Sequence, residues 1–430
     1  MSVAPYPEYR SSSLTPTGVA PKHWLDGVVK RGFSITLGKM VVASNENDDR
    51  PTRPYLRSAN VQDGWLALDD VKEMYFSPTE AASLSLLEGD LVICEGGDVG
   101  RCALLRGNLE GYGFQNSINR ARGKAGNHTA YLAYWLSHLK NNGFIDVLCN
   151  RSTIAHYTAE KLANTPMLMP TPEEQSAIAA FLDQETGKID ALVAEQERLI
   201  ALLKEKRQAV ISQAVTKGLN PNASMKDSGI EWLGQVPAHW EILAVWLIFE
   251  LGRGRVISHE EIFSNAGDFP VYSSQTENNG EMGHIATFDF DGDYLTWTTD
   301  GANAGTVFRR SGKFNCTNVC GTMRLKSPQS DLDYLCHALS ACTAAYVRQD
   351  INPKLMNNVM SKIRIPIPPA DEQSEIASIV RRAITKFDTL ITEATQAITL
   401  LRERRAALIS AAVTGKIDVR ALATSQPEAA

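Results

Sequence analysis

The chain has 430 residues and a net charge of −6, and 43% of its residues are hydrophobic while 21% are charged. This length exceeds what one hydrophobic core usually supports, so we expect a globular protein of two or three domains. No apolar run approaches the roughly 20 residues of a membrane-spanning helix, and the start of the sequence lacks the basic-then-apolar order of a secretory signal. We therefore expect a cytoplasmic protein, whose seven cysteines, without any zinc-like spacing, are free thiols and form no metal site.

Residues 1–168 are predicted to form a first module rich in β-structure. Short β-branched or aromatic runs alternate there with Gly, Asn and Asp, which favour turns. The segment Gly89–Arg101 reads GDLVICEGGDVGR, in which an acidic GD precedes a short strand and a glycine-rich turn. The motif Pro21-Lys22-His23-Trp24 stands near the entrance of the module. We interpret His23 as a packing residue, because no nucleophile or carboxylate recurs beside it in the two copies of this motif.

Residues 169–220 are predicted to form a long helix. Thr171 suits the N-cap, Pro172 the first helical position and Gly218 the residue after the last turn. At ~1.5 Å per residue, about 45 residues make a rod of about 65 Å, which few small modules can cover. A pairing helix is therefore expected, and the alternative is an amphipathic helix that lies on its own globular core. The predicted seam recurs at steps of three, four and seven: Ile178, Leu182, Ile189, Leu192, Leu199, Leu203 and Val210.

Residues 221–366 are predicted to form a second β-rich module. Its entrance, Pro237-Ala238-His239-Trp240, resembles that of the first module. The segment Phe269–Phe308 again contains an acidic GD, a short strand and a glycine-rich turn. Elsewhere the two modules diverge strongly, so the chain is predicted to carry two similar supports with different surfaces.

Residues 367–418 are predicted to form a second long helix that repeats the first. Between Glu174–Thr216 and Glu372–Thr414, at a constant offset of 198, 20 of 43 positions are identical. Chance does not produce such a match, so the segment is duplicated. Gly415 suits the residue after the last turn, and residues 419–430 are predicted to be a disordered tail. The seam of the second copy comprises Ile376, Val380, Phe387, Leu390, Ala397, Leu401 and Leu408.

The repeat predicts an α+β fold with two β-rich domains in tandem, each followed by a long helix. Because both helices carry the same seam, we expect them to pair as an antiparallel coiled coil with pseudo-two-fold symmetry. Similar rods that carry dissimilar modules suit the reading of two different DNA half-sites. A rod of this length corresponds to roughly 20 base pairs at ~3.4 Å per pair.

Several segments resemble the specificity subunits of type I restriction-modification systems. They are WLGQVPAHWEI (Trp232–Ile242), YSSQTENNGEMGHI, YLTWTTDGANAGTVF, INPKLMNNVMSKIRIPIPP (Ile351–Pro369) and both rods. The resemblance covers nearly the whole chain, in the order recognition domain, rod, recognition domain, rod. It implies a non-catalytic subunit that recognises a bipartite DNA target and docks two methyltransferase subunits on its helices. Restriction subunits with translocase and nuclease activity would join the complex.

The sequence carries no motif for the chemistry of such a complex. The nearest string to the Asn-Pro-Pro-aromatic loop of an adenine methyltransferase is Asn352-Pro353-Lys354-Leu355, which we interpret as a turn. Gly32 to Lys39 fails the P-loop spacing. We therefore expect no cofactor on this chain, and expect S-adenosylmethionine, ATP and Mg²⁺ only on partner subunits. The alternative functions are a coiled-coil scaffold with protein-binding modules and, less supported, an enzyme.

Polar clusters in both modules are the candidate DNA contacts, because base edges favour Arg, Lys, Asn, Gln, Ser and Thr. Ordinary loop residues are the alternative for each of them. The net charge of −6 does not suit a protein that binds nucleic acid alone, so partners are expected to share the electrostatic attraction. In the first module the candidates are Arg101, Gln115, Asn116, Ser117, Asn119, Arg120, Arg122, Arg151, Ser152, Thr153 and His156. In the second they are Tyr272, Ser273, Ser274, Gln275, Thr276, Asn278, Asn279, Thr298, Thr299, Asn315, Asn318, Lys354, Asn357 and Asn358.

Overall fold

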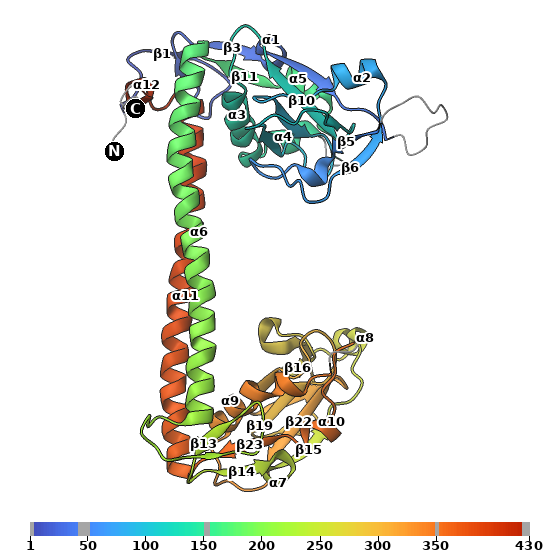
Figure 1. Ribbon diagram of the computed structural model, residues 1–430, viewed down its shortest axis with the longest axis vertical. Helices are drawn as coiled ribbons and strands as arrows, with labels where there is room; N and C mark the ends of the chain where they lie inside the picture. Colours follow the sequence, from blue (N-terminus) through green and yellow to red (C-terminus); the bar gives the residue numbers. More distant parts are fainter. Residues whose placement is uncertain (1–3, 42–51, 150–154, 349–351, 424–430) are drawn as a thin grey trace. The chain divides into compact units, whose positions relative to one another are not determined.

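The computed structural model of the chain describes residues 4–41, 52–149, 155–348 and 352–423 (Figure 1). It divides into two compact units: unit 1 comprises Met1–Gln196 with Gln396–Ala430, and unit 2 comprises Glu197–Thr395. Each unit holds one β-rich module, half of the long helix that follows it and half of the other long helix. The compact units therefore differ from the sequence-based segments, which gave each long helix a segment of its own. None of the helices in the described ranges combines the length and the apolarity that a bilayer crossing requires.

The module of unit 1 contains two main sheets and short helices. One sheet has the strand order β4-β10-β7-β8 and is antiparallel throughout, and the other has the order β6-β5-β9. Two-stranded pairs, β1-β2 and β3-β11, complete it. The elements are β1 (Tyr9–Ser11), β2 (Val19–Pro21), β3 (Leu25–Val28), α1 (Val29–Gly32), β4 (Phe33–Leu37), β5 (Thr52–Leu56), η1 (Ser58–Asn60), β6 (Lys72–Tyr75), α2 (Pro78–Ser83), β7 (Leu91–Cys94), β8 (Cys102–Leu104), β9 (Gly113–Phe114), β10 (Ile118–Gly123), α3 (Thr129–Asn141), α4 (Phe144–Cys149), α5 (Ala159–Asn164) and β11 (Pro166–Met169).

The module of unit 2 has the matching architecture. Its main sheet has the order β15-β22-β19-β20, and a second sheet has the order β17-β16-β21-β18. The pairs β12-β13 and β14-β23 correspond to β1-β2 and β3-β11. The elements are β12 (Met225–Asp227), β13 (Gln235–Pro237), β14 (Glu241–Ala244), α7 (Val245–Ile248), β15 (Phe249–Arg253), α8 (His259–Ser264), β16 (Phe269–Tyr272), η2 (Glu277–Gly280), β17 (Glu281–Ile285), β18 (Phe290–Asp291), β19 (Tyr294–Thr298), β20 (Val307–Arg310), β21 (Lys313–Cys316), β22 (Cys320–Leu325), α9 (Leu332–Cys342), η3 (Thr343–Tyr346), α10 (Asn357–Met360) and β23 (Arg364–Ile367).

The strand registers of the two modules also match. Leu91 of β7 lies opposite Ala121, and Leu295 of β19 lies opposite Met323, at the same place in each main sheet. In the second sheets, β5 runs parallel to β9 as β16 runs parallel to β21. The duplication seen in the helices therefore extends through both modules, although most of their side chains differ.

Both ends of a long helix contribute to the core of a module. Helix α6 (Pro172–Lys217) begins beside the module of unit 1, where Ile178 and Leu182 are fully buried. The same core contains Val413 from the end of helix α11 (Ala370–Val413). In unit 2 the roles are exchanged, because the core there contains the start of α11 and Val215 from the end of α6. Each module thus packs against the start of one helix and the end of the other.

The ends of the long helices follow the predicted capping pattern. The Oγ1 atom of Thr171 accepts a hydrogen bond from the backbone N–H of Glu174, at 3.4 Å, and Pro172 is the first residue of α6. Gly218 and Gly415 follow the last turns with φ of 74° and 71°. A Cβ atom at Gly415 would also lie only 2.3 Å from Cδ of Pro21, so only glycine fits that position.

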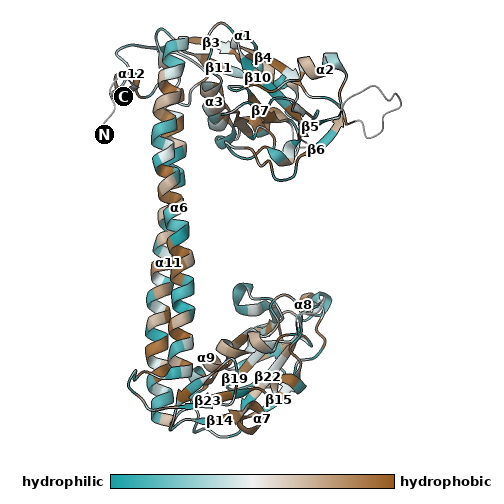
Figure 2. Ribbon diagram, viewed as in Figure 1, coloured by the Kyte–Doolittle hydropathy of each residue, from teal (hydrophilic) through white to brown (hydrophobic). Residues whose placement is uncertain are grey.

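The antiparallel pairing of the long helices is confirmed within each unit. In unit 1, Arg405 near the end of α11 donates to Asp190 in the first half of α6, at 2.9 Å. In unit 2, Arg207 near the end of α6 donates to Asp388 in the first half of α11. The second ion pair is the repeat of the first, since both of its residues are displaced by 198 positions. Hydrophobic and hydrophilic residues alternate in bands along both helices, as expected of helices with one buried face (Figure 2).

The predicted seam is partly wrong in the middle of each helix. Leu192, Leu199 and Leu390 are exposed, whereas the neighbouring Val193 and Ile391 are half-buried. Successive helical residues are separated by about 100°, so a shift of one position moves a side chain off the contact face. The contact face continues through half-buried polar residues such as Gln196 and Arg207. Of the other predicted seam residues, Ile178, Leu182, Ile189, Ile376 and Val380 are buried and Leu203, Val210, Phe387, Ala397, Leu401 and Leu408 are half-buried.

The tail prediction is wrong for its first residues. Val419 is fully buried in the core of unit 1, and residues Arg420–Ala423 form helix α12. Asp418 holds this segment through its backbone N–H, which donates to the carbonyl oxygen of Ala4, and through its carboxylate, which pairs with Arg420 at 2.6 Å. The apolar side chain of Val419 therefore packs in the core of unit 1, a contact that the sequence did not indicate.

Candidate nucleic-acid interface

In unit 1 the predicted polar clusters converge beside the glycine-rich turn that follows β7. Arg101 donates through Nη2 to the carbonyl oxygen of Ser58, at 2.9 Å. Ser58 in turn bonds Ser117, because its backbone N–H donates to Oγ of Ser117 and its Oγ donates to the carbonyl oxygen of Ser117. Three segments that lie far apart in the sequence are thereby fixed against one another.

Glu95 lies in the middle of this convergence. Its backbone N–H donates to the carbonyl oxygen of Ser117, at 2.8 Å, and its own carbonyl oxygen accepts from the N–H of Tyr157, at 2.7 Å. The side-chain amide of Asn119 donates to Oε2 of Glu95, at 3.4 Å, and to the carbonyl oxygen of Tyr157, at 3.0 Å. Burial raises the pKa of Glu95 above its ordinary value, and the nearby His156 offsets part of that rise. No ion pair joins Glu95 to another of the described residues.

Two arginines predicted to contact DNA serve the interior of the module instead. Arg120 is buried, and its guanidinium donates to the carbonyl oxygens of Ser83 and Ser85, at 3.1 and 2.6 Å. Burial lowers the pKa of its guanidinium, with a smaller contribution from the neighbouring Arg122. Arg122 donates two hydrogen bonds to the carboxylate of Asp90, at 2.6 and 2.7 Å. Both side chains stabilise the folded module.

In unit 2 a similar convergence surrounds Asp300, which follows β19. Its carboxylate accepts a hydrogen bond from Oγ1 of Thr299, at 2.7 Å. Arg253 and Lys354 lie 3.8 and 3.5 Å from its oxygens. Arg253 also donates to the carbonyl oxygen of Asn318, at 2.6 Å. The predicted clusters at 298–299, 315–318 and 354–358 therefore meet at one edge of the module, together with a cation that was not predicted.

The loop after β16 presents a second set of polar side chains. Gln275, Thr276 and Asn278 are exposed, and Ser273 and Ser274 are half-buried. Asn278 has a positive φ of 46°, a conformation that asparagine adopts more readily than most residues. This loop is positioned by Tyr272, whose ring is covered by the buried guanidinium of Arg310 at 3.6 Å. Its exposed side chains stay candidates for contact with DNA.

Five of the predicted DNA-reading residues that the structure describes are buried, which corrects the prediction of direct base contact for them. Thr298 donates to the carbonyl oxygen of Asn303, and Asn315 donates to that of Thr287. Such side chains have their partners inside the module and present no polar group to a duplex. The five are Asn119, Arg120, Thr298, Thr299 and Asn315.

The other predicted residues divide into three groups. Arg151, Ser152 and Thr153 lie outside the described residues. The half-buried Arg122 is held by Asp90, and the accessible candidates are Arg101, Gln115, Asn116, Ser117, His156, Tyr272, Ser273, Ser274, Gln275, Thr276, Asn278, Asn279, Asn318, Lys354, Asn357 and Asn358.

The sequence analysis missed Glu95, Asp300 and Arg253. It searched for hydrogen-bond donors and amides, so the acids were passed over. The signal was present nevertheless, because Glu95 stands directly after the short strand of the repeated GD-strand-glycine pattern, and Asp300 is the second residue after that strand in the other copy. Aligning that pattern between the modules would have drawn attention to these positions.

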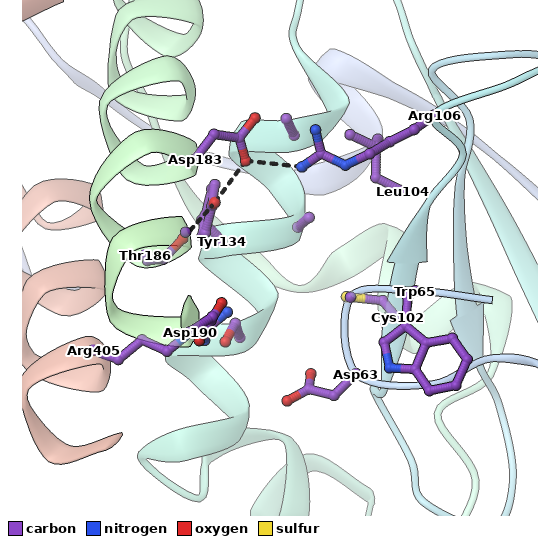
Figure 3. Close-up of a pocket in the computed structure, with 15 residues that line it drawn as sticks. Asp63, Trp65, Cys102, Leu104, Arg106, Tyr134, Asp183, Thr186, Asp190 and Arg405 are labelled. Atoms are coloured by element: carbon purple, nitrogen blue, oxygen red, sulfur yellow. Dashed lines mark hydrogen bonds and ion pairs between the residues drawn. The ribbon is translucent and has the colours of Figure 1, made fainter. Parts of the chain in front are cut away.

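A pocket of about 300 Å³ lies between the module of unit 1 and helix α6 (Figure 3). Asp183 points into it and accepts hydrogen bonds from Tyr134, at 2.7 Å, and from Arg106, at 3.1 Å. The ion pair of Asp190 with Arg405 forms another part of its wall. None of the predicted DNA-reading residues lines this pocket, so it is separate from the candidate interface.

Comparisons with known proteins agree with this architecture. A family model described as the type I restriction modification DNA specificity domain matches residues 33–200 and again residues 237–400. The N-terminus of a putative type I specificity subunit of Mycoplasma pneumoniae is 44% identical over 134 residues, which are 31% of this chain and 72% of that sequence. Another putative type I specificity subunit of the same organism is 33% identical over 232 residues, which are 54% of this chain and 80% of that protein.

Solved structures share the fold at low sequence identity. A chain from a study of complex assembly and conformational transition of the type I R-M system has a TM-score of 0.71 and 13% identity, with 93% of this chain and 99% of that chain covered. The HsdS subunit from Thermoanaerobacter tengcongensis has a TM-score of 0.51 and 13% identity, with 93% and 98% covered. Two matched modules joined to two paired long helices thus define the class of the protein. The chain belongs to the family of type I restriction-modification DNA specificity subunits, as its sequence resemblance implied.

Proposed function

We infer that the chain selects the DNA on which a type I restriction-modification complex acts, and that it recognises a bipartite target with one half-site for each module. The supporting observation is that the two modules share their strand order and register while most of their side chains differ at equivalent positions. The position after β7 is Glu95, and the same position after β19 is Thr299. Recognition of two different DNA sequences requires two modules of similar backbone that carry different side chains.

The accessible polar side chains at the two convergences are the proposed DNA contacts. In unit 2, Arg253 and Lys354 are both suited to phosphate oxygens, because they are partly exposed cations at one edge of the module. Arg101 occupies the corresponding convergence of unit 1. Since phosphate contacts fix the position of a protein on DNA and base contacts give specificity, we assign these cations to positioning.

The long helices are proposed to dock two methyltransferase subunits. Unit 1 exposes Leu192 and Leu400, and unit 2 exposes Leu390 and Leu202. These are equivalent pairs, because Leu192 and Leu202 are each repeated 198 positions later. The recurrence of the same exposed leucines in both units marks them as candidates for burial by a partner. Two equivalent surfaces suit two copies of one partner.

The chain is further proposed to be non-catalytic. Its sequence carries neither the Asn-Pro-Pro-aromatic loop of an adenine methyltransferase nor a P-loop. In this proposal the methyltransferase subunits bind S-adenosylmethionine, and restriction subunits bind ATP and Mg²⁺. The net charge of −6 fits a chain that meets cytoplasmic DNA together with partners that supply part of the positive charge.

The proposal is tested by co-expressing the chain with its methyltransferase subunit and sequencing the methylated genomic sites. The expected result is one bipartite adenine motif, with two specified segments separated by an unspecified spacer. A complex that forms but shows no sequence preference would instead support the scaffold function. Methyl transfer by the chain alone would contradict the assignment of catalysis to partners.

A further inference from the structure

The carboxylate of Glu95 has no evident role in holding its module together. The matched position in unit 2 is Thr299, and its backbone makes the same contacts. The N–H of Glu95 donates to the carbonyl oxygen of Ser117, and the N–H of Thr299 donates to that of Val319. The carbonyl oxygen of Glu95 accepts from the N–H of Tyr157, and that of Thr299 accepts from the N–H of Leu355. The fold therefore accepts a neutral side chain at this position.

The carboxylate is nevertheless held in a costly environment. It is half-buried, and burial raises its pKa, which shows that the charged form is less well solvated than in water. Among the described residues, the side chain that donates to it is the amide of Asn119, and no other described side chain bonds Oε1 or the other lone pairs of Oε2. The carboxylate that follows Thr299 in unit 2, that of Asp300, differs from the carboxylate of Glu95 because the cations of Arg253 and Lys354 lie beside it.

The surroundings of Glu95 restrict what it can bind. Arg101, Ser117 and His156 bring side chains suited to DNA to the same edge of the module. A carboxylate repels phosphate, so within a DNA complex its favourable partner is a base that donates a hydrogen bond. In the major groove, the amino group of cytosine is such a donor, whereas adenine sets an N7 acceptor beside its amino group.

We propose that Glu95 is a specificity-determining residue that accepts a hydrogen bond from the N4 amino group of a cytosine in the half-site read by unit 1. This inference rests on the proposed function. Asn119 acts as a positioning residue, since its amide bonds both Glu95 and the carbonyl oxygen of Tyr157 and so fixes the carboxylate.

The test uses the full chain in complex with its methyltransferase subunit. Methylation rates are measured on duplexes in which every base pair of the wild-type motif is changed in turn. The variant Glu95→Gln places an amide, which pairs well with adenine, at this position. We expect its preference for cytosine over adenine at one base pair of the motif to fall by roughly ten-fold or to reverse. The second half-site should keep its full discrimination. Glu95→Asp should still prefer cytosine at that position, at a lower rate.

Glu88→Gln is the matched control, because Glu88 is an exposed acid just before β7, at the opposite end of the strand from Glu95. It should leave discrimination unchanged at every position. The inference is overturned if Glu95→Gln shows the wild-type profile at all positions, or if it lowers all rates by one common factor. A wild-type complex without a bipartite motif would contradict the proposed function itself, so the two failures are distinguishable. Thermal melting of each variant establishes that its fold is intact.

Discussion

The phenolic oxygen of Tyr131 donates to the carbonyl oxygen of Val413, at 3.3 Å, and so ties a helix of the first module to the end of the second long helix. The same hydroxyl contacts the carbonyl oxygen of Leu168, at 3.1 Å. In unit 2, Tyr334 makes the equivalent contacts with Val215 and Pro366, at 3.3 and 2.8 Å. Because the last carbonyls of a helix lack partners within it, these hydroxyls also complete the helix ends.

Removing either hydroxyl should destabilise its own unit. Tyr131→Phe removes the O–H that the buried carbonyl oxygens of Leu168 and Val413 share, at an expected cost of about 1–2 kcal/mol in the free energy of unfolding. Tyr334→Phe should act in the same way on unit 2. Denaturant unfolding measures both. Tyr75→Phe is the control, since no other described residue bonds that hydroxyl; equal losses in all three variants would argue against the assigned roles.

The exposed leucine pairs should each carry one methyltransferase subunit. In the double variant Leu192→Glu/Leu400→Glu, a charged surface replaces the apolar surface of unit 1, so native mass spectrometry should show one partner subunit lost. Leu202→Glu/Leu390→Glu should have the same effect through unit 2. Gln184→Glu, an exposed charge change on α6, should retain both subunits. Retention of two subunits by both double variants would place the docking surface elsewhere.

Lys354 should contribute to affinity for DNA and leave the sequence preference unchanged. Because its ammonium is partly exposed beside Asp300, Lys354→Ala removes a proposed phosphate contact. The dependence of log K on log salt should become shallower by about one unit, equally for all target sequences. Lys416→Ala, which changes an exposed lysine that follows α11, should keep the wild-type slope. A changed motif with an unchanged slope would show that Lys354 reads bases.

Asn315 should affect stability and not recognition. Its side chain is fully buried and donates to the carbonyl oxygen of Thr287, at 2.8 Å. Asn315→Ala should therefore lower the free energy of unfolding by about 1–2 kcal/mol while the methylated motif stays the same. Melting and motif sequencing are measured on the same preparation, and a motif altered at one base would restore Asn315 as a DNA-reading residue.

Both units should lose stability as the solution becomes mildly acidic. Burial lowers the pKa of His138 and of His337, and for His337 the charge of Asp333 opposes this shift while that of Arg381 adds to it. The unfolded chain takes up protons near pH 6.5, while the folded state resists them. Stability is therefore greatest above pH 6.5 and falls as the pH drops below it, until the folded histidines are protonated as well. Melting at pH 7.5 and 5.5 should show this fall, and it should shrink in the His138→Gln/His337→Gln double variant.

The long helices and their duplication follow from local patterns in the sequence. The offset of 198, the cap at Thr171 and the glycines after the last turns depend on residues close together in the chain, and each is found in the structure. The identity of the contact face does not follow in the same way. Periodicity shows that a helix has an apolar side, but the partner helix decides between neighbours such as Leu192 and Val193, which point about 100° apart.

The candidate interface shows the same division. Composition indicated which segments are polar, and the structure brings these segments together at one edge of each module. The burial of single side chains could not be predicted, because it depends on segments that are distant in the sequence. The amide of Asn119 bonds Tyr157 and Glu95, and the carbonyl oxygen of Thr299 accepts from the N–H of Leu355. The sequence by itself determined the repeated supports, since their signals are local and periodic. Only the tertiary structure decided which polar side chains face outward and which are buried, since burial arises from contacts between residues far apart in the chain.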